Sequence, residues 1–272
     1  MLMKLKLFAN KRQVMKNTIL LLLLCLSFSA YANEEREKTA LKKSYFYGLE
    51  YRIKAGFNIG GTSPLPLPAE IRELKSYRPG MQIAIEGNVI KWLDEQKKWG
   101  ALLGIRLESK GMRTDARVKN YYMVMDASEG DQTGHMEGNW TGYVKTTVKN
   151  SYATIPIQVI HKLSPRWDIK FGPYISILTD GDFSGSAYDG YLREGNPTGT
   201  KVNVTEATYD FSSDLRKFQW GVDVGGEWRA YRHLSVYADL TWGLNGIFPK
   251  DFKSITFKMY NIYLNFGFGY VF

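Results

Sequence analysis

The final stretch of the chain, ITFKMYNIYLNFGFGYVF (residues 255–272), carries the pattern that decides the fold. Alternate positions from Tyr260 to Phe272 are apolar or aromatic, and the positions between them are mostly small or polar. A period of two is that of a β-strand with two different faces. Because a strand in lipid cannot leave an open edge, this pattern predicts that the preceding chain supplies partner strands with the same alternation and closes a barrel.

Seven further segments show the same alternation, which makes eight predicted strands in all. They are residues 47–60, 81–89, 99–110, 152–159, 167–177, 218–229 and 234–245. The connections alternate between long and short, which is typical of membrane barrels with long extracellular loops and short periplasmic turns. The sequence therefore predicts an all-β fold: an eight-stranded antiparallel transmembrane β-barrel.

Three stretches between or within these strands need separate treatment. Residues 61–80 contain four prolines and are predicted to be a loop, as are 111–151 and 179–214. Within 111–151, the segments YYMVM and YVKTTV have strand character and indicate a hairpin extension. Pro156 and Pro173 lie inside predicted strands, where they are expected to mark bulges or breaks in pairing.

The first 32 residues have the pattern of a cleavable signal peptide. Basic residues precede the apolar run TILLLLLCLSFSA, and Ala30-Tyr31-Ala32 provides a small-residue cleavage site. The alternative, a membrane anchor, requires a longer apolar run. We expect residues 33–44 to be a periplasmic lead-in and residues 45–272 to form the barrel.

Removal of this segment changes which function classes remain open. The sole cysteine, Cys25, lies within it, so the mature chain has no thiol or disulfide chemistry. The mature chain keeps 31 basic and 27 acidic residues, a net charge of +4 instead of +9, which argues against nucleic acid as a partner. No apolar run of helical-span length follows residue 32, which excludes a helical membrane protein.

Alternation alone does not say which face points inward, so a secreted lipocalin-like barrel is the structural alternative. Glycine is frequent on the polar face, as expected for a narrow lumen that must hold long charged side chains. Aromatic residues gather near the predicted strand ends, as in interfacial girdles. One girdle would contain Trp92, Trp99, Trp167, Trp228 and Phe272. Both features favour the membrane barrel.

With these strands in place, the chain resembles the outer-membrane β-barrel domain of the Bacteroidetes that is often called PorT-like, a porin-family small barrel of OmpA/OmpX-like architecture. The matching stretches are IKAGFNIGG, LLGIRLESKGM, ATIPIQVIHKL, FGPYISIL, GVDVGGEW and LTWGLNGI, together with the aromatic C-terminus. The resemblance implies location in the outer membrane of a Gram-negative cell. It also implies that Phe268, Tyr270 and Phe272 serve as a signal to the barrel assembly machinery.

Thirteen charged residues occupy the predicted inward face. They are Glu50, Arg52, Lys54, Glu86, Arg106, Glu108, Lys110, Asp168, Lys170, Asp223, Glu227, Arg229 and Asp239. Because buried charges must be paired, we expect a salt-bridge network that plugs the lumen. A narrow porin-like channel for small solutes is the alternative.

No catalytic, cofactor or metal site is predicted. A barrel hydrolase or acyltransferase remains a second alternative, since His135 lies near Asp126, Glu129 and Asp131. The segment DGDFSGSAYDG lacks the terminal glutamate of an EF-hand calcium loop. Segments 111–151 and 179–214 are rich in residues suited to adaptable contacts with a protein or glycan. We therefore expect a non-enzymatic protein that binds a partner through these segments or through its periplasmic turns, besides lipids. Such binding would serve envelope integrity or secretion-associated assembly.

Overall fold

The computed structural model describes residues 48–129 and 132–272, without the side chains of residues 126–135. The predicted signal peptide and lead-in (1–44) lie outside the described residues. Leu49–Phe272 form one compact unit of ten antiparallel strands. The strands are β1 (Leu49–Pro64), β2 (Ile71–Pro79), β3 (Gln82–Trp92), β4 (Trp99–Glu129), β5 (Gln132–Ser164), β6 (Trp167–Glu194), β7 (Lys201–Asp210), β8 (Phe218–Arg229), β9 (Leu234–Gly243) and β10 (Met259–Val271).

The strand pairings return to their starting point. β1 pairs with β3, and the order continues through β4, β5, β6, β8, β9 and β10 back to β1. β2 pairs with β4 at Met112–Val118, beyond the residues of β4 that pair with β3. β7 pairs with β6 and, at one position, with β4. The ring is uneven, because β4, β5 and β6 have 28–33 residues and the other members 10–16. The predicted all-β antiparallel class is confirmed.

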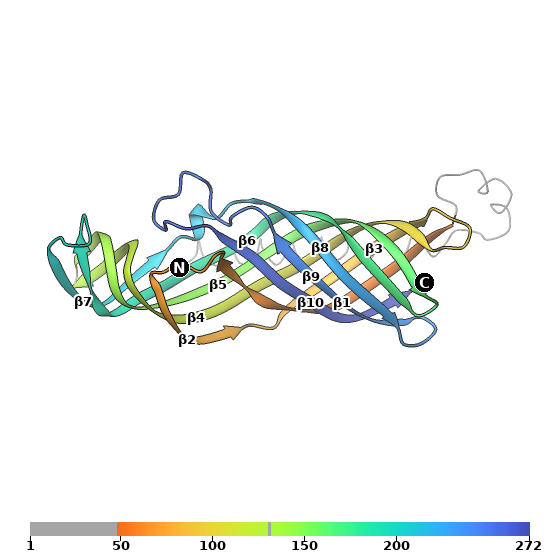
Figure 1. Ribbon diagram of the computed structural model, residues 1–272, viewed down its shortest axis with the longest axis horizontal. Coiled ribbons are helices and arrows are strands. Elements are labelled where there is room, and N and C mark those ends of the chain that lie inside the picture. Colours follow the sequence, from red (N-terminus) through yellow and green to blue (C-terminus); the bar gives the residue numbers. More distant parts are fainter. Residues whose placement is uncertain (1–47, 130–131) are drawn as a thin grey trace, which may run out of the picture. The chain divides into compact units, whose positions relative to one another are not determined.

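The two ends of the unit differ in their connections (Figure 1). At one end, here named the turn end, short turns join β3 to β4, β5 to β6 and β8 to β9, and the C-terminus lies beside them. At the opposite end, here named the hairpin end, β4, β5, β6 and β7 extend furthest. Among the residues that the structure describes, no helix is long and apolar enough to cross a membrane.

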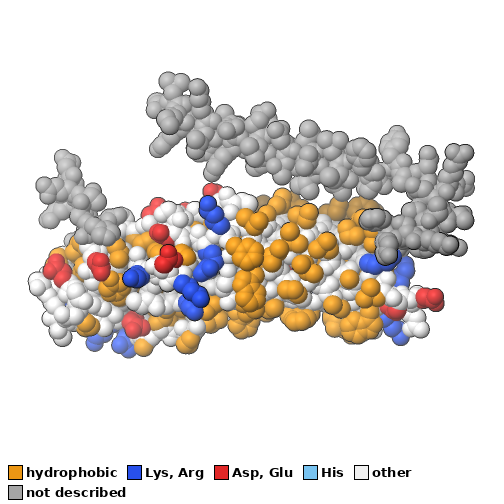
Figure 2. Space-filling view, turned by 90° about the horizontal axis from the view of Figure 1, so that it is seen from above, with side chains coloured by type: hydrophobic (Ala, Val, Ile, Leu, Met, Phe, Trp, Pro, Cys, Tyr) orange, Lys and Arg blue, Asp and Glu red, His pale blue; other side chains and the backbone are white. Residues whose placement is uncertain are grey.

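Figure 2 shows an apolar belt over the half of the unit nearer the turn end, with charged side chains on both sides of it. Exposed apolar side chains occur on every strand of the ring. On β4 the belt consists of Trp99, Leu103, Ile105 and Leu107, whose side chains are 41–60% exposed. These positions span nine residues, the length of strand that crosses a bilayer. Trp99, Trp167, Trp228 and Phe272 are exposed in the belt near the turn end, but Trp92 is not. Trp92 faces inward and its indole N–H donates to Glu50 Oε2 at 3.1 Å, so its predicted place in the girdle is wrong.

Between the belt and the hairpin end, which we call above the belt, the pattern of buried and exposed side chains inverts. On β4, Arg106 is buried and Leu107 is exposed, whereas beyond Gly111 the arginines are exposed and Met112 is buried. β5 and β6 invert at the same level, because Gly111 pairs with Lys149 and Lys149 with Asp182. Below this level the polar groups lie inside, as a lipid environment requires; above it they lie outside, as water requires.

The hairpin end therefore has an ordinary apolar core, here named the hairpin-end core. Buried residues from β4 to β7 and from the segment before β10 form it, among them Met123, Trp140, Phe183, Tyr209 and Phe248. Burial raises the pKa of the Tyr209 hydroxyl, which donates to the Lys145 carbonyl at 2.8 Å. The phenol consequently stays protonated and links β7 to β5.

The prediction that 111–151, 179–214 and 61–80 are loops is wrong. Most of 111–151 belongs to β4 and β5, most of 179–214 to β6 and β7, and part of 61–80 to β1 and β2. The inversion explains the error, because strand residues above the belt carry polar side chains outward and resemble loops in composition. YYMVM and YVKTTV do form the predicted hairpin extension.

The two strand prolines interrupt pairing as predicted, without a bulge. The β4–β5 pairing skips from Leu103 to Arg106 opposite Pro156, and the β5–β6 pairing skips from Pro156 to Val159 opposite Pro173. Proline has no N–H to donate, so the ladder lapses there while the register on both sides is unchanged.

Candidate functional site

The charged residues predicted for the lumen gather inside the belt. Eleven of the thirteen are buried: Arg52, Lys54, Glu86, Arg106, Glu108, Lys110, Asp168, Lys170, Asp223, Glu227 and Asp239. The other two, Glu50 and Arg229, lie at the turn end and are partly exposed, 3.8 Å apart. The structure thus brings together residues from β1, β3, β4, β6, β8 and β9, because alternate residues of each strand point to the same interior.

Arg52 organises the level nearest the turn end. Its guanidinium lies 2.6 Å from Glu50, 2.8 Å from Asp168 and 3.0 Å from Glu227. Three carboxylates around one guanidinium suit its planar set of five donors. Below this level, Ile90, Trp92, Leu102 and Ile160 form a small buried apolar cluster. The interior near the turn end is therefore occupied by packed side chains.

The middle level contains a chain of alternating charges. Lys54 Nζ lies 2.9 Å from Glu86 and 3.3 Å from Asp239, and Lys170 Nζ lies 2.8 Å from Asp239. Arg106 contacts Glu86 through Nε and lies 3.1 Å from Asp223 through Nη2. Each carboxylate that bridges two cations is held from two strands, which links β1, β3, β4, β6, β8 and β9 across the interior.

The level nearest the hairpin end pairs Lys110 with Glu108 at 3.0 Å. The Lys110 ammonium also lies 5.4–5.8 Å from the ring centroids of Tyr152, Tyr174 and Tyr263. A cation among aromatic faces gains attraction from the ring quadrupoles. Here the interior changes from charged to aromatic, immediately below the hairpin-end core.

Neutral polar residues that the prediction did not include complete the network. Asn58 and Thr154 donate to Glu108, Asn88 donates to Glu86, and Gln158 donates to Asp223. All four are buried. These four residues lie on the same predicted inward faces as the charged residues. Their place in the network could have been predicted from that, because in a narrow interior every polar residue must find a hydrogen-bond partner.

Glycines make room for these side chains. A Cβ at Gly225 would clash with Asp239 Oδ1, and one at Gly104 would clash with Asn88 Oδ1. Both contacts are far inside van der Waals distance, so only glycine leaves the neighbouring polar group in place. This agrees with the interpretation of the glycine-rich face as the crowded inner one.

The two histidines whose side chains the structure describes lie away from the network. The His161 ring lies tilted against the Trp99 ring with centroids 4.0 Å apart, and His233 Nδ1 lies 2.7 Å from the Val271 carbonyl. The side chain of His135 lies outside the described residues. Over the described part of the chain, no group of three His, Cys, Asp or Glu residues is placed to hold a metal ion. The segment DGDFSGSAYDG runs along β6.

The C-terminal aromatics lie on the opposite side of the wall from the network. Phe268, Tyr270 and Phe272 are 47–63% exposed in the belt. The Phe272 amide donates to the Tyr51 carbonyl at 3.1 Å, which continues the pairing of β10 with β1. These residues thus belong to the strand that joins the two ends of the ring.

A closed order of strands, an apolar belt outside and polar groups inside are the features of a membrane β-barrel. Comparison of the sequence with curated proteins gives no match. Residues 31–249, which include β1 to β9, match the family described as outer membrane protein beta-barrel domain. The match covers more than half of the chain, and the chain belongs to this family of outer-membrane β-barrel domains.

Proposed function

We propose that the protein is a non-enzymatic outer-membrane barrel of eight membrane strands, closed by its charge network, that binds a partner through the strands beyond the membrane. The match to an outer-membrane β-barrel family supports a location in the outer membrane. The short turns would face the periplasm, and export would use the cleavable signal in residues 1–32. The narrower assignment to PorT-like barrels of the Bacteroidetes belongs to this proposal and is supported by the motifs of β1, β4, β5, β6, β8 and β9.

One observation carries the closed lumen: the ion pairs bridge the interior from strand to strand. Lys54, on β1, contacts carboxylates of β3 and β9, and Arg106, on β4, contacts carboxylates of β3 and β8. A solute that crosses the lumen would have to separate these ion pairs, whose charged groups are already removed from water. The apolar cluster and the hairpin-end core support closure below and above the network.

Purified protein reconstituted in a planar lipid bilayer should therefore give no steady open channels. Conductance at neutral pH and moderate salt is the measurement, with a known porin in the same bilayer as the positive control. Steady, voltage-independent openings would contradict the closed lumen and support the alternative of a narrow channel for small solutes.

The hairpin end supplies the proposed binding surface. β4, β5 and β6 continue beyond the belt and form, with β7, a sheet with its own core, so the outer faces of these strands are held in fixed positions. Binding surfaces placed on ordered strands lose little conformational entropy on association. A protein or glycan partner at this surface would explain why so many residues of the chain lie beyond the membrane.

The cysteine-free barrel permits a direct test of this surface. Lys119→Cys and Thr205→Cys, at exposed positions of β4 and β7, should each form a discrete adduct in intact cells with a membrane-impermeant thiol cross-linker. Lys97→Cys, exposed in a turn at the opposite end, is the matched control and should give none. Adducts from Lys97→Cys alone, or from none of the three in cells that display the labelled barrel, would contradict the proposal.

A further inference from the structure

The barrel wall has an opening between β1 and β2. β1 pairs with β3 only as far as Asn58 opposite Gln82, while its other edge continues with β10 to Pro64. β2 pairs with β4 at Met112–Val118, and no described residue of β2 pairs with β1. The segment 59–79 therefore frames an opening, here named the window, whose sides are the end of β1 and β2.

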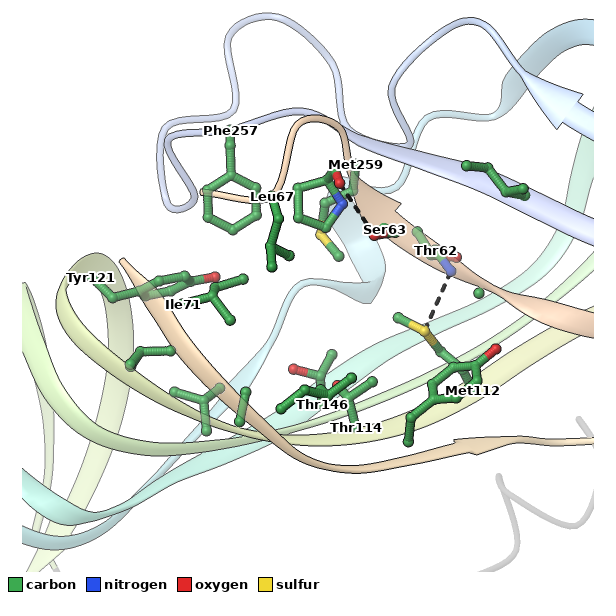
Figure 3. Close-up of a pocket in the computed structure, with 18 of the residues that line it drawn as sticks. Thr62, Ser63, Leu67, Ile71, Met112, Thr114, Tyr121, Thr146, Phe257 and Met259 are labelled. Carbon is green, nitrogen blue, oxygen red and sulfur yellow. Dashed lines mark hydrogen bonds between the residues drawn. The ribbon is translucent and has the colours of Figure 1, made fainter. Parts of the chain in front are cut away.

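A cavity of about 490 Å³ lies inside the window (Figure 3). Leu67, Ile71 and Tyr121 face it from one side, and Met112, Thr114 and Thr146 from another. The volume lies in the range of small-molecule pockets, and most of the lining is apolar. The cavity suits a hydrocarbon group better than a polar solute.

The unpaired edge of β1 contributes to this cavity. The Thr62 amide, which has no strand partner on this side, donates to Met112 Sδ at 3.3 Å. Sulfur is a weak acceptor, so the strand edge is held only loosely. A Cβ at Gly61 would lie 3.1 Å from the same sulfur, so glycine keeps the floor of the cavity free.

The rim of the window is apolar and exposed. Leu65, Leu67, Leu74 and Tyr77 are 44–62% exposed. An apolar patch of this kind is unfavourable in water but suits contact with lipid. Tyr77 pairs with Thr114, just above the level at which β4 inverts, so the window opens at the outer boundary of the belt.

Positive charge lies next to the window at the same level. Arg78 and Arg113 are directly opposite each other in the β2–β4 register, and both are exposed. Together with Lys149 they line a second hollow of about 280 Å³, and Met112 lines both hollows. Like charges directly opposite on a sheet repel, and a phosphate that bridges two guanidinium groups removes the repulsion.

We propose that this window is a binding site for a phosphate-bearing lipid of the outer leaflet. One acyl chain enters the cavity between β1 and β2, and the phosphate binds Arg78 and Arg113. The apolar rim and the neighbouring cations match the two chemically different parts of such a lipid at the depth where its headgroup lies. The site is independent of whether the lumen conducts.

Binding to the full-length barrel in neutral detergent tests the site. The probes are dipalmitoyl phosphatidic acid, dipalmitoylglycerol with the same chains, and inorganic phosphate, titrated and counted by native mass spectrometry. We expect one phosphatidic acid per barrel, bound about tenfold or more tightly than dipalmitoylglycerol. Inorganic phosphate alone should not displace it.

Two variants separate the parts of the site. Arg78→Gln combined with Arg113→Gln should reduce phosphatidic acid binding to the level of dipalmitoylglycerol. Thr114→Phe, which fills the cavity, should weaken both lipids about tenfold or more. Ala116→Leu fills the same cavity and replaces Thr114→Phe if that variant loses the heat-modifiable folded band.

Arg117→Gln is the matched control, because Arg117 is an exposed arginine on the same strand whose Nε lies 3.2 Å from Glu73. Its lipid binding should equal that of the natural chain. The proposal is overturned if the filled variants bind phosphatidic acid normally, if the double glutamine variant does, or if inorganic phosphate displaces the lipid completely. The last outcome would identify a simple anion site.

Discussion

Replacement of Arg106 by methionine is expected to lower the free energy of unfolding by about 3–5 kcal/mol, the cost of leaving a buried charge without its partner. Arg106 is fully buried and lies 3.1 Å from Asp223. Its other partner, Glu86, keeps Lys54 in the variant, but among the described residues Asp223 would retain only the amide of Gln158 at 3.3 Å. The destabilisation should therefore arise mainly from Asp223.

Urea titration of the barrel in detergent, followed by heat-modifiable migration and tryptophan fluorescence, measures this loss. The second substitution Asp223→Asn should restore a large part of it, because it removes the orphaned charge and keeps a hydrogen-bonding side chain. Arg117→Gln, in an exposed ion pair, should change stability by less than about 1 kcal/mol. Equal losses in Arg106→Met with and without Asp223→Asn would show that packing, and not charge, holds this level together.

The inward-facing residues of the strands inside the belt were predictable, because the period of two assigns every residue of a strand to one face. Arg52, Lys54 and Glu86 are buried as that period requires. Glu50 and Arg229 are partly exposed, because they lie near the ends of their strands, where the inward-facing side chains reach the edge of the interior. Local sequence therefore determines which residues enter the lumen.

The partners within the network could not be predicted in the same way. Arg52 pairs with Asp168 across 116 residues, and Lys54 with Asp239 across 185. These contacts depend on the stagger between neighbouring strands, summed around the ring, and a single-residue slip would redirect every side chain. A list of inward charges contains no information about that stagger.

The extended hairpins were missed for a different reason. A strand in lipid and a strand in water have opposite patterns, so the alternation of β4 reverses its meaning at Gly111 although the strand continues. Arg113 and Arg117 then suggest a polar loop, and Met112 and Val118 suggest isolated apolar residues. The reversal itself, at paired positions of β4, β5 and β6, is the signal that marks the membrane boundary.

The second large effect is expected at the C-terminal strand. Replacement of Phe268, Tyr270 and Phe272 together by alanine should reduce the amount of folded barrel in the outer membrane severely, by about tenfold or more if recognition by the assembly machinery loses as little as 1.4 kcal/mol. The three side chains face outward in the belt and bury little inside the protein. Their removal should consequently affect insertion more than the stability of the folded barrel.

A matched triple substitution separates these two effects. Phe218, Trp220 and Trp228 of β8 are also outward-facing aromatics, 37–52% exposed in the same belt. Their replacement by alanine removes comparable lipid contact but leaves the C-terminus intact. We expect the β8 variant to reach the outer membrane at nearly the natural level, and both variants to refold equally well from urea into detergent. If both variants reach the outer membrane equally poorly, the role of the C-terminal residues reduces to lipid contact. If only the β10 variant is poorly inserted, and only in cells, then β10, which closes the ring on β1, also directs assembly of the barrel.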